Sequence, residues 1–113
     1  MGVIIDIGYD PKTSIDTKNR NYIKYEYSKN GKGSVEVTEH RNIDTLPGYK
    51  KCVHKPKHGA QIGEVFRGEV RQNGLEKSYD SDSITVYFWE LDRKYMSPLL
   101  LQLGDEYYKT YDA

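Results

Sequence analysis

Residues 83–91 read Ser-Ile-Thr-Val-Tyr-Phe-Trp-Glu-Leu, and this is the most strand-like stretch of the sequence. Alternate residues of a β-strand face opposite sides of the sheet. Both sides of this strand would carry large side chains, so we expect it to lie centrally in a sheet or under a covering element. One side would carry Ile84, Val86 and Phe88, and the other Thr85, Tyr87, Trp89 and Leu91.

Further strands are expected before this one. Residues 3–7 alternate as a first strand, and residues 23–28 and 35–38 predict a hairpin around a glycine-rich turn at residues 30–33. A second hairpin is expected from residues 62–71 and 75–79, joined by Asn73-Gly74. Residues 40–60 look irregular, because prolines and glycines interrupt them.

One short helix is expected near the C-terminus. Ser97 can cap it, Pro98 suits its first position, and Gly104 suits its exit after residues 99–103. The predicted fold class is therefore mainly β to α+β. It is an antiparallel twisted sheet built from hairpins, with this one helix, in a single domain spanning residues 1–113.

The composition limits the class of protein. Only 36% of the 113 residues are hydrophobic, so the eleven tyrosines must supply part of the core. Cys52 is the single cysteine, which excludes an intramolecular disulfide and favours a reducing compartment. The first residues lack the pattern of a secretory signal, and no apolar stretch is long enough to span a bilayer. We therefore expect a cytoplasmic protein.

The charge is balanced in total but not along the chain. Residues 1–58 hold 11 Lys+Arg and 7 Asp+Glu, and residues 59–113 hold 6 and 10, so the halves carry +4 and −4. The basic residues gather in residues 49–58, where they could follow a nucleic-acid backbone. The neutral total charge favours this less than protein binding. The candidate anion-binding residues are Lys50, Lys51, His54, Lys55, Lys57 and His58.

Neither a metal site nor a catalytic site is expected. Cys52, His54 and His58 are metal-binding residue types, but the neighbouring lysines repel a dication. A general acid–base pair of one histidine with a lysine has nothing in the sequence to fix its geometry. The chain also lacks a Gly-x-Ser-x-Gly elbow and a complete phosphate-binding loop. We therefore expect a protein that is not an enzyme and has no cofactor.

The acidic end of the chain is rich in tyrosine. Tyrosine is favoured at binding interfaces because it gives rigid contact area with a hydrogen-bonding tip. A terminus usually frays unless it is docked, so this cluster is hard to explain as core. It predicts a partner-facing surface or an added edge strand. The candidate partner-binding residues here are Asp105, Glu106, Tyr107, Tyr108 and Tyr111.

Two segments carry a family resemblance. Residues 1–7, followed by Tyr9-Asp10 and Lys12-Thr13, resemble the start of the immunity proteins of cloacin and ribonuclease-type colicins. Residues 26–29 and 33–35 are similar to the second strand and turn of these proteins. The resemblance implies an antiparallel sheet with a short helix, and tight binding that blocks a secreted nuclease. It also marks Asp6, Glu26 and Glu36 as partner contacts.

The leading hypothesis is a non-enzymatic protein-binding inhibitor that blocks its partner by surface occlusion. An immunity protein against a toxin and a phage-encoded blocker of a host-defence enzyme both fit, and no membrane is involved. The alternative is a small β domain that binds nucleic acid or nucleotide through residues 49–58.

Overall fold

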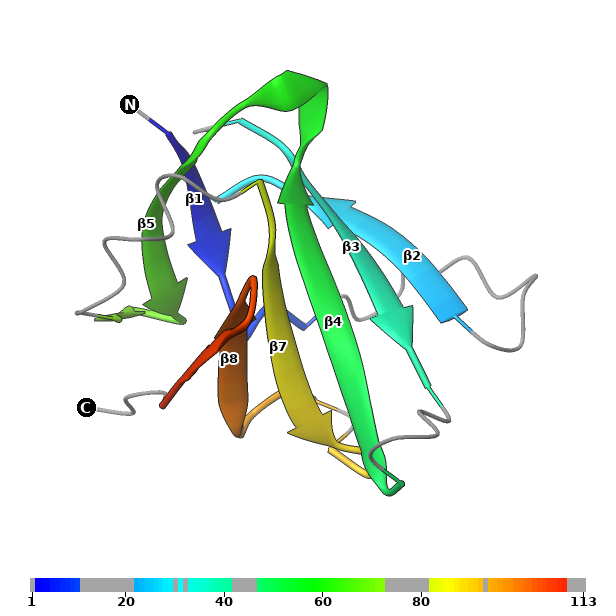
Figure 1. Ribbon diagram of the computed structural model, residues 1–113. Coiled ribbons are helices and arrows are strands. Elements are labelled where there is room, and N and C mark those ends of the chain that lie inside the picture. Colours follow the sequence, from blue (N-terminus) through cyan, green and yellow to red (C-terminus); the bar gives the residue numbers. More distant parts are fainter. Residues whose placement is uncertain are drawn as a thin grey trace.

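The structure is a computed structural model of the chain, and it describes residues 2–10, 22–29, 31, 33–41, 47–72, 82–92 and 94–109 (Figure 1). Within these ranges the chain forms β-strands and one short 3₁₀ turn, η1 (Lys57–Gly59). The strands make two sheets that share one core. No helix in this part of the chain is long and apolar enough to cross a membrane.

The larger sheet has six strands in the order β2-β3-β4-β7-β8-β9, and neighbouring strands are antiparallel. The side chains of β3 alternate between buried and half-buried, which is the period-two pattern that its sequence predicts. The first hairpin is thus confirmed, and β7 lies inside the sheet as expected. The strands are β2 (Tyr22–Tyr27), β3 (Val35–His40), β4 (Tyr49–Pro56), β7 (Ile84–Trp89), β8 (Leu100–Leu103) and β9 (Glu106–Tyr108).

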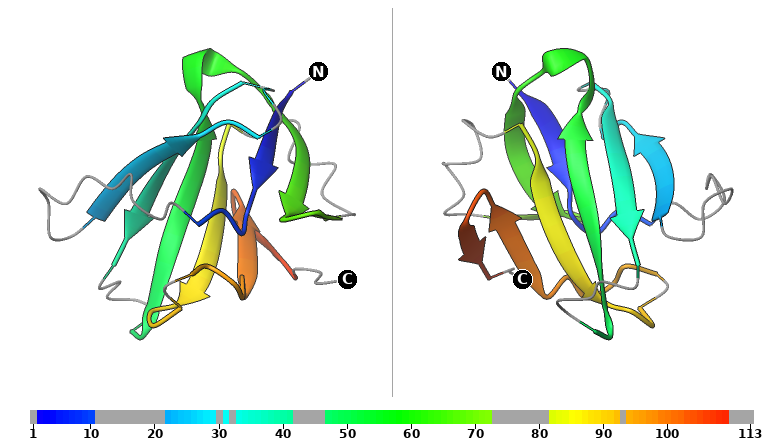
Figure 2. Two further views of the ribbon diagram at one scale, coloured as in Figure 1. Left: turned by 180° about the vertical axis from the view of Figure 1, so that it is seen from behind. Right: turned by 45° about the vertical axis from the view of Figure 1, so that its right-hand side comes forward.

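The smaller sheet has three strands in the order β1-β5-β6, namely β1 (Val3–Asp6), β5 (Ile62–Arg67) and β6 (Val70–Arg71). The chain leaves the larger sheet after β4, passes through η1 and enters the smaller sheet as β5 (Figure 1). The smaller sheet then packs against one face of the larger sheet (Figure 2). The strands β1 and β5 are parallel, which departs from the wholly antiparallel sheet that the sequence predicts. The long excursion through the larger sheet supplies the connection that parallel strands need.

The core between the sheets combines aliphatic, aromatic and polar side chains. Its largest fully buried apolar residues include Ile5, Ile62, Ile84, Phe88 and Leu101. Tyrosine supplements them, as Tyr25 and Tyr27 are 5% and 6% exposed. Polar groups are also enclosed, namely Asp6, Glu39, Lys50, His54 and Gln72. Because a buried polar group costs free energy unless it is hydrogen-bonded, we expect each of these residues to have bonding partners inside the protein.

The sequence predicts an irregular segment at residues 40–60, but residues 49–56 of it form a strand. They form β4, which lies between β3 and β7 in the larger sheet. The alternation of this strand places polar side chains on the core side, where Lys50, Cys52 and His54 are buried. A polar strand that is buried on one face has no hydrophobic alternation to reveal it, so its composition suggested a solvated loop.

The predicted helix near the C-terminus is wrong. Residues 100–103 form β8, and Gly104, with φ of 60°, makes the turn into β9. Leu101 and Leu103 are buried while Leu100 and Gln102 are half-buried, so the period of two prevails over the helix-capping signals. Pairing with β7 gives the backbone of β8 its hydrogen-bond partners, whereas an isolated two-turn helix is only marginally stable.

The second predicted hairpin differs from the structure in its turn. The chain reverses at Gly68, where φ is 61°, so that β5 and β6 form a shorter hairpin than the one expected. Glycine adopts this left-handed conformation without steric cost. The predicted turn at Asn73-Gly74 and the strand at residues 75–79 lie outside the described residues.

Candidate functional site

The outer face of the larger sheet, turned away from the smaller sheet, carries aromatic side chains on neighbouring strands. Cross-strand partners point to the same face of a sheet. Tyr49 pairs with Trp89, and their rings meet edge to face with centroids 5.6 Å apart. Farther along, Tyr87 donates a hydrogen bond of 2.7 Å to Gln102, which pairs with Tyr107 on β9. Trp89 and Tyr107 are 49% and 56% exposed.

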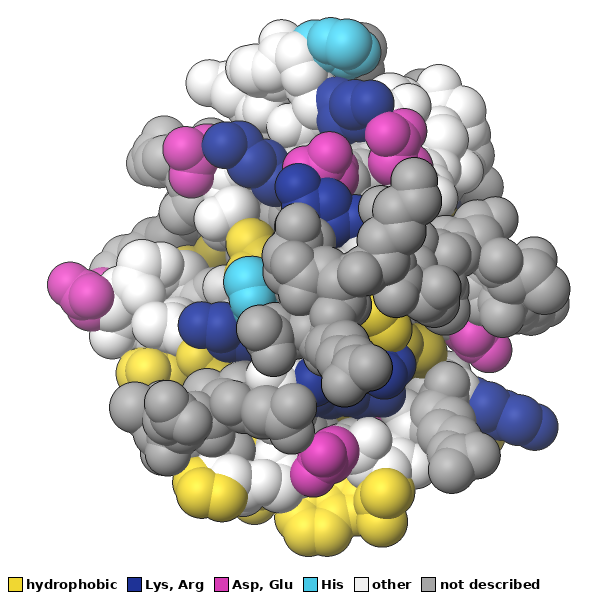
Figure 3. Space-filling view, turned by 90° about the vertical axis from the view of Figure 1, so that its right-hand side faces the viewer, with side chains coloured by type: hydrophobic (Ala, Val, Ile, Leu, Met, Phe, Trp, Pro, Cys, Tyr) yellow, Lys and Arg dark blue, Asp and Glu magenta, His cyan; other side chains and the backbone are white. Residues whose placement is uncertain are grey.

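The segment after Trp89 adds exposed apolar side chains at the end of the sheet where β7 stops and β4 begins (Figure 1). Leu91, Met96 and Leu99 are 69%, 67% and 47% exposed. Hydrophobic side chains gather at the lower end of the view onto the β2–β3 side, whereas acidic and basic ones mix in its upper part (Figure 3). We call Tyr49, Trp89, Leu91, Met96 and Leu99 the apolar end.

Hydrogen bonds fix the backbone of residues 90–92 and 94–99. The Glu90 N–H donates to the Gly48 carbonyl at 2.9 Å, and the Leu99 N–H donates to the Tyr87 carbonyl at 2.9 Å. Between these ends, the two carboxylate oxygens of Asp92 accept bonds from the N–H groups of Met96 and Ser97, at 3.1 and 2.9 Å. The loop that displays the apolar end therefore has a defined shape.

A buried polar cluster lies beneath this loop. Tyr95 projects inward from the loop, is 4% exposed, and donates its hydroxyl hydrogen to Oε1 of Glu39. Oε2 of Glu39 accepts a bond of 2.7 Å from Arg41 Nε, and Cys52 Sγ lies 3.7 Å from Oε1. Burial, followed by the bond to Glu39 and its charge, raises the pKa of Tyr95, so the phenol stays protonated and remains a donor.

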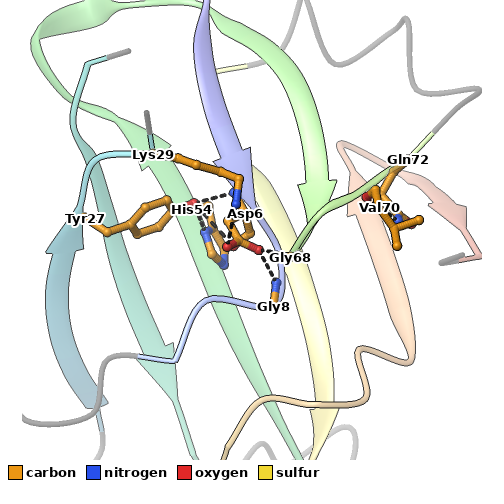
Figure 4. A network of polar contacts seen from close by, with 8 residues as sticks. All are labelled: Asp6, Gly8, Tyr27, Lys29, His54, Gly68, Val70 and Gln72. Carbon is orange, nitrogen blue, oxygen red and sulfur yellow. Dashed lines mark hydrogen bonds and ion pairs between the residues drawn. The ribbon is translucent and has the colours of Figure 1, made fainter. Parts of the chain in front are cut away.

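A second polar cluster joins the two sheets (Figure 4). Oδ2 of Asp6 on β1 pairs with Lys29 Nζ at 3.2 Å, and Oδ1 accepts bonds from the N–H groups of Gly8 and Gly68 at 3.0 and 3.1 Å. The Asp6 N–H donates to the Tyr27 hydroxyl oxygen at 2.8 Å. Asp6 was a partner contact by resemblance, yet its carboxylate bonds within the fold, and the residue is 8% exposed.

The structure divides the predicted partner-binding residues between opposite edges of the larger sheet. At the β9 edge, Tyr107, Asp105 and Glu106 are exposed, and the hydroxyl of the half-buried Tyr108 donates to Oε2 of Glu106 at 2.6 Å. β9 is an edge strand, one of the two arrangements expected for this segment. Tyr111 lies outside the described residues.

The other predicted contacts lie at the β2 edge, where they face lysines of the same protein. Glu26 accepts a bond of 2.7 Å from Lys57 Nζ, and Glu36 pairs with Lys55 across the β3–β4 ladder. Glu26 on β2 and Glu36 on β3 are separated from β9 by at least the three strands β4, β7 and β8, so one compact surface does not include both groups.

The predicted anion-binding segment is also divided. Lys50 and His54 are 2% and 1% exposed, because they project to the core side of β4, so neither is available to an external anion. Lys51 and Lys55 project to the outer face, and Lys57 and the exposed His58 lie in η1. The outer face here holds a shallow hollow of about 330 Å³, lined by Lys24, Thr38, His40 and Val53.

In the described ranges, no group of three or more His, Cys, Asp or Glu side chains could hold a metal ion.

The chain matches no family model, no curated protein and no solved structure. The chemistry of its own surface is therefore the guide to its function.

Sequence reasoning missed the apolar end and the polar cluster beneath it. Trp89 lies on a strand face as predicted, but the sequence also predicts Leu91 on that face and Leu99 in a helix, and both lie in the loop. Their exposure depends on the course of the loop, which no periodicity in the sequence encodes. The nearest signal is Asp92 followed by Ser97-Pro98, since an aspartate that bonds nearby backbone N–H groups is typical of a structured turn.

Proposed function

We propose that this protein is a non-enzymatic inhibitor that binds a folded protein partner and blocks it by covering its surface. The observation that carries the proposal is the half-exposed Trp89, held against Tyr49 at the border of a loop with further exposed apolar side chains. Exposed large apolar residues that gather on one surface typically mark a binding site. Tryptophan and tyrosine often supply most of the binding free energy at such sites.

The alternative of a nucleic-acid binder is less well supported by the distribution of charge. Binding to a phosphate backbone needs a surface of uncompensated cations. Lys50 is buried, Lys57 pairs with Glu26, and Lys55 faces Glu36. The exposed leucines and methionine of the apolar end also suit the apolar pockets of a protein better than the faces of nucleobases.

The proposed class of partner is a toxin or a host-defence enzyme, and the proposed site of action is the cytoplasm. The resemblance of the N-terminal segments to colicin immunity proteins supports this class of partner. Cys52, a buried free thiol and the only cysteine of the chain, supports the cytoplasm as the site of action. An occluding inhibitor needs no catalytic group, only a rigid surface of defined shape.

The test uses three immobilised forms of the protein: the wild type, Trp89→Ser and Glu64→Gln. Glu64 is an exposed residue of β5 in the smaller sheet and serves as the matched control. A bacterial lysate is passed over each form, and retained proteins are quantified by mass spectrometry. We expect one stoichiometric partner that wild type and Glu64→Gln retain and that Trp89→Ser loses by at least tenfold.

The purified partner is then titrated into the free protein. Trp89 is the single tryptophan of the chain, so its emission should shift to shorter wavelength when a partner excludes water from the apolar end. The inhibited activity of the partner should follow the same binding curve. Equal retention by all three forms, or an unchanged emission on binding, would contradict the proposal.

A further inference from the structure

The exposed side chains of the apolar end depend on a loop whose central residue has an unfavourable backbone conformation. Tyr95 has a φ of 58°, in the left-handed region that costs free energy for any residue other than glycine. Residues keep such conformations only where surrounding contacts impose them, and such positions concentrate at functional sites. Contacts from β3, β4 and β7 of the larger sheet reach Tyr95 and Asp92, and one contact from the smaller sheet reaches Met96.

The first contact fixes the tip and ring of Tyr95. Its hydroxyl donates to the fully buried carboxylate of Glu39 on β3, and its ring meets that of Phe88 edge to face, with centroids 5.2 Å apart. Since Arg41 donates to the second oxygen of Glu39, the carboxylate is held from both sides. A bond between a neutral phenol and a buried carboxylate is stronger than one between neutral groups.

The second contact comes from Lys50 on β4, the strand next to β3. Its Nζ donates a bond of 2.8 Å to the Asp92 carbonyl and lies 4.2 Å from the centroid of the Tyr95 ring. The same Asp92 bonds the N–H groups of Met96 and Ser97 through its carboxylate. Lys50 is thus connected to both halves of the loop through one residue.

A third contact reaches the loop from the smaller sheet. Arg67 on β5 donates a bond of 2.7 Å from Nη2 to the Met96 carbonyl. The Met96 backbone is therefore bonded on both sides, although the residue is 67% exposed.

We propose that Glu39 and Lys50 are positioning residues of the binding surface, which act through Tyr95 and Asp92 to hold Leu91 and Met96 outward before a partner arrives. Burying a carboxylate and an ammonium group is costly, and apolar residues of similar volume would often stabilise a fold at least as well. The gain is a surface that loses little conformational entropy on binding. The role of the surface rests on the proposed function, but the preformed loop is a property of the free protein.

The test compares two buried tyrosines by hydrogen–deuterium exchange of the free protein. Tyr95→Phe keeps the ring and removes the donor to Glu39. Tyr27→Phe removes a hydroxyl from the other polar cluster, away from the loop, and is the matched control. We expect exchange at Asp92 and residues 94–97 to rise at least tenfold in Tyr95→Phe, with β3 and β7 unchanged, and to stay at the wild-type rate in Tyr27→Phe.

Lys50→Met supplies a second variant, because it keeps the apolar stem and removes the amine. We expect the same local increase in exchange at Asp92 and residues 94–97. Loop exchange that rises equally in Tyr95→Phe and Tyr27→Phe would show a general loss of stability and overturn the proposal, as would unchanged loop exchange in both Tyr95→Phe and Lys50→Met. These measurements need no partner, so they stand or fall independently of the proposed function. With the partner in hand, Tyr95→Phe should weaken binding at least tenfold.

Discussion

The hydroxyl oxygen of Tyr27 lies 2.9 Å from Nδ1 of His54, and both side chains are buried between the two sheets. The Tyr27 oxygen accepts a bond from the Asp6 N–H, so its own hydrogen is directed to Nδ1 as the nearer acceptor, the Asp6 carbonyl being at 3.4 Å. This arrangement requires a neutral imidazole with its hydrogen on Nε2. Accordingly, burial lowers the pKa of His54 to about 3.

His54 should make the protein less stable in acid. The unfolded chain binds a proton at this residue below its ordinary pKa of 6.5, whereas the folded protein does not until about pH 3, so the free energy of unfolding falls as the pH falls between these values. From pH 7.5 to 5 this group should cost about 2 kcal/mol. Urea unfolding of the wild type and His54→Asn at both pH values measures it. Parallel pH dependence in the two proteins would contradict the assignment.

Cys52 should not react with thiol reagents in the folded protein. Its side chain is buried, and burial, followed by the charge of Glu39, raises the pKa of the thiol, so the reactive thiolate is scarce. We expect labelling by a disulfide reagent at pH 8 only as fast as the protein unfolds, and immediate labelling in urea. Stoichiometric labelling within seconds under native conditions would contradict the burial of Cys52.

Gly63→Ala should separate the paired strands β1 and β5. A Cβ at Gly63 would lie 2.8 Å from the Gly2 backbone, which is closer than real Cβ contacts allow. We expect a loss of about 2–3 kcal/mol in the free energy of unfolding, which is more than the control loses. Gly59→Ala is the control, since φ is 70° there but nothing lies within 4 Å of the added Cβ. Its cost should be about 1 kcal/mol, from the backbone conformation alone. Equal costs for the two would exclude a steric contact between the strands.

Asp6→Asn should weaken the connection between the sheets. It keeps an oxygen for the Gly8 and Gly68 N–H groups but removes the charge that pairs with the half-buried Lys29. We expect a loss of about 1–3 kcal/mol in the free energy of unfolding, measured by urea denaturation. Arg71→Met breaks an exposed ion pair with Glu64 and should change stability by about 0.5 kcal/mol or less. A similar effect of the two variants would mean that the Asp6 cluster contributes no more than a surface pair.

Part of the fold could be predicted because periodicity is local. The alternation of residues 23–28, 35–38 and 83–91 identified β2, β3 and β7, since one face of each strand had to be buried. The helix at residues 97–104 failed because its capping residues also suit the entrance and the turn of a strand. Only the presence of β7 alongside decides between these two structures.

The candidate site was less predictable than the fold. The sequence pointed to tyrosines and acidic residues near the C-terminus and to the lysines of residues 49–58. The sheet order then placed the C-terminal residues at the β9 edge, away from Glu26 and Glu36, and the alternation of β4 turned Lys50 inward. Exposure belongs to a residue's neighbours in space, so it could not be read from residue type.

By itself, the sequence determined the class of the fold, the need for tyrosine in the core and the absence of an intramolecular disulfide, because composition and alternation fix these properties. Tertiary structure decided which polar residues are enclosed and which apolar residues are displayed. Glu39 and Tyr95 lie 56 positions apart and meet only after β3, β4 and β7 have paired. The loop that carries Leu91 and Met96 obtains its shape from that meeting, since the contacts that offset its backbone cost are non-local.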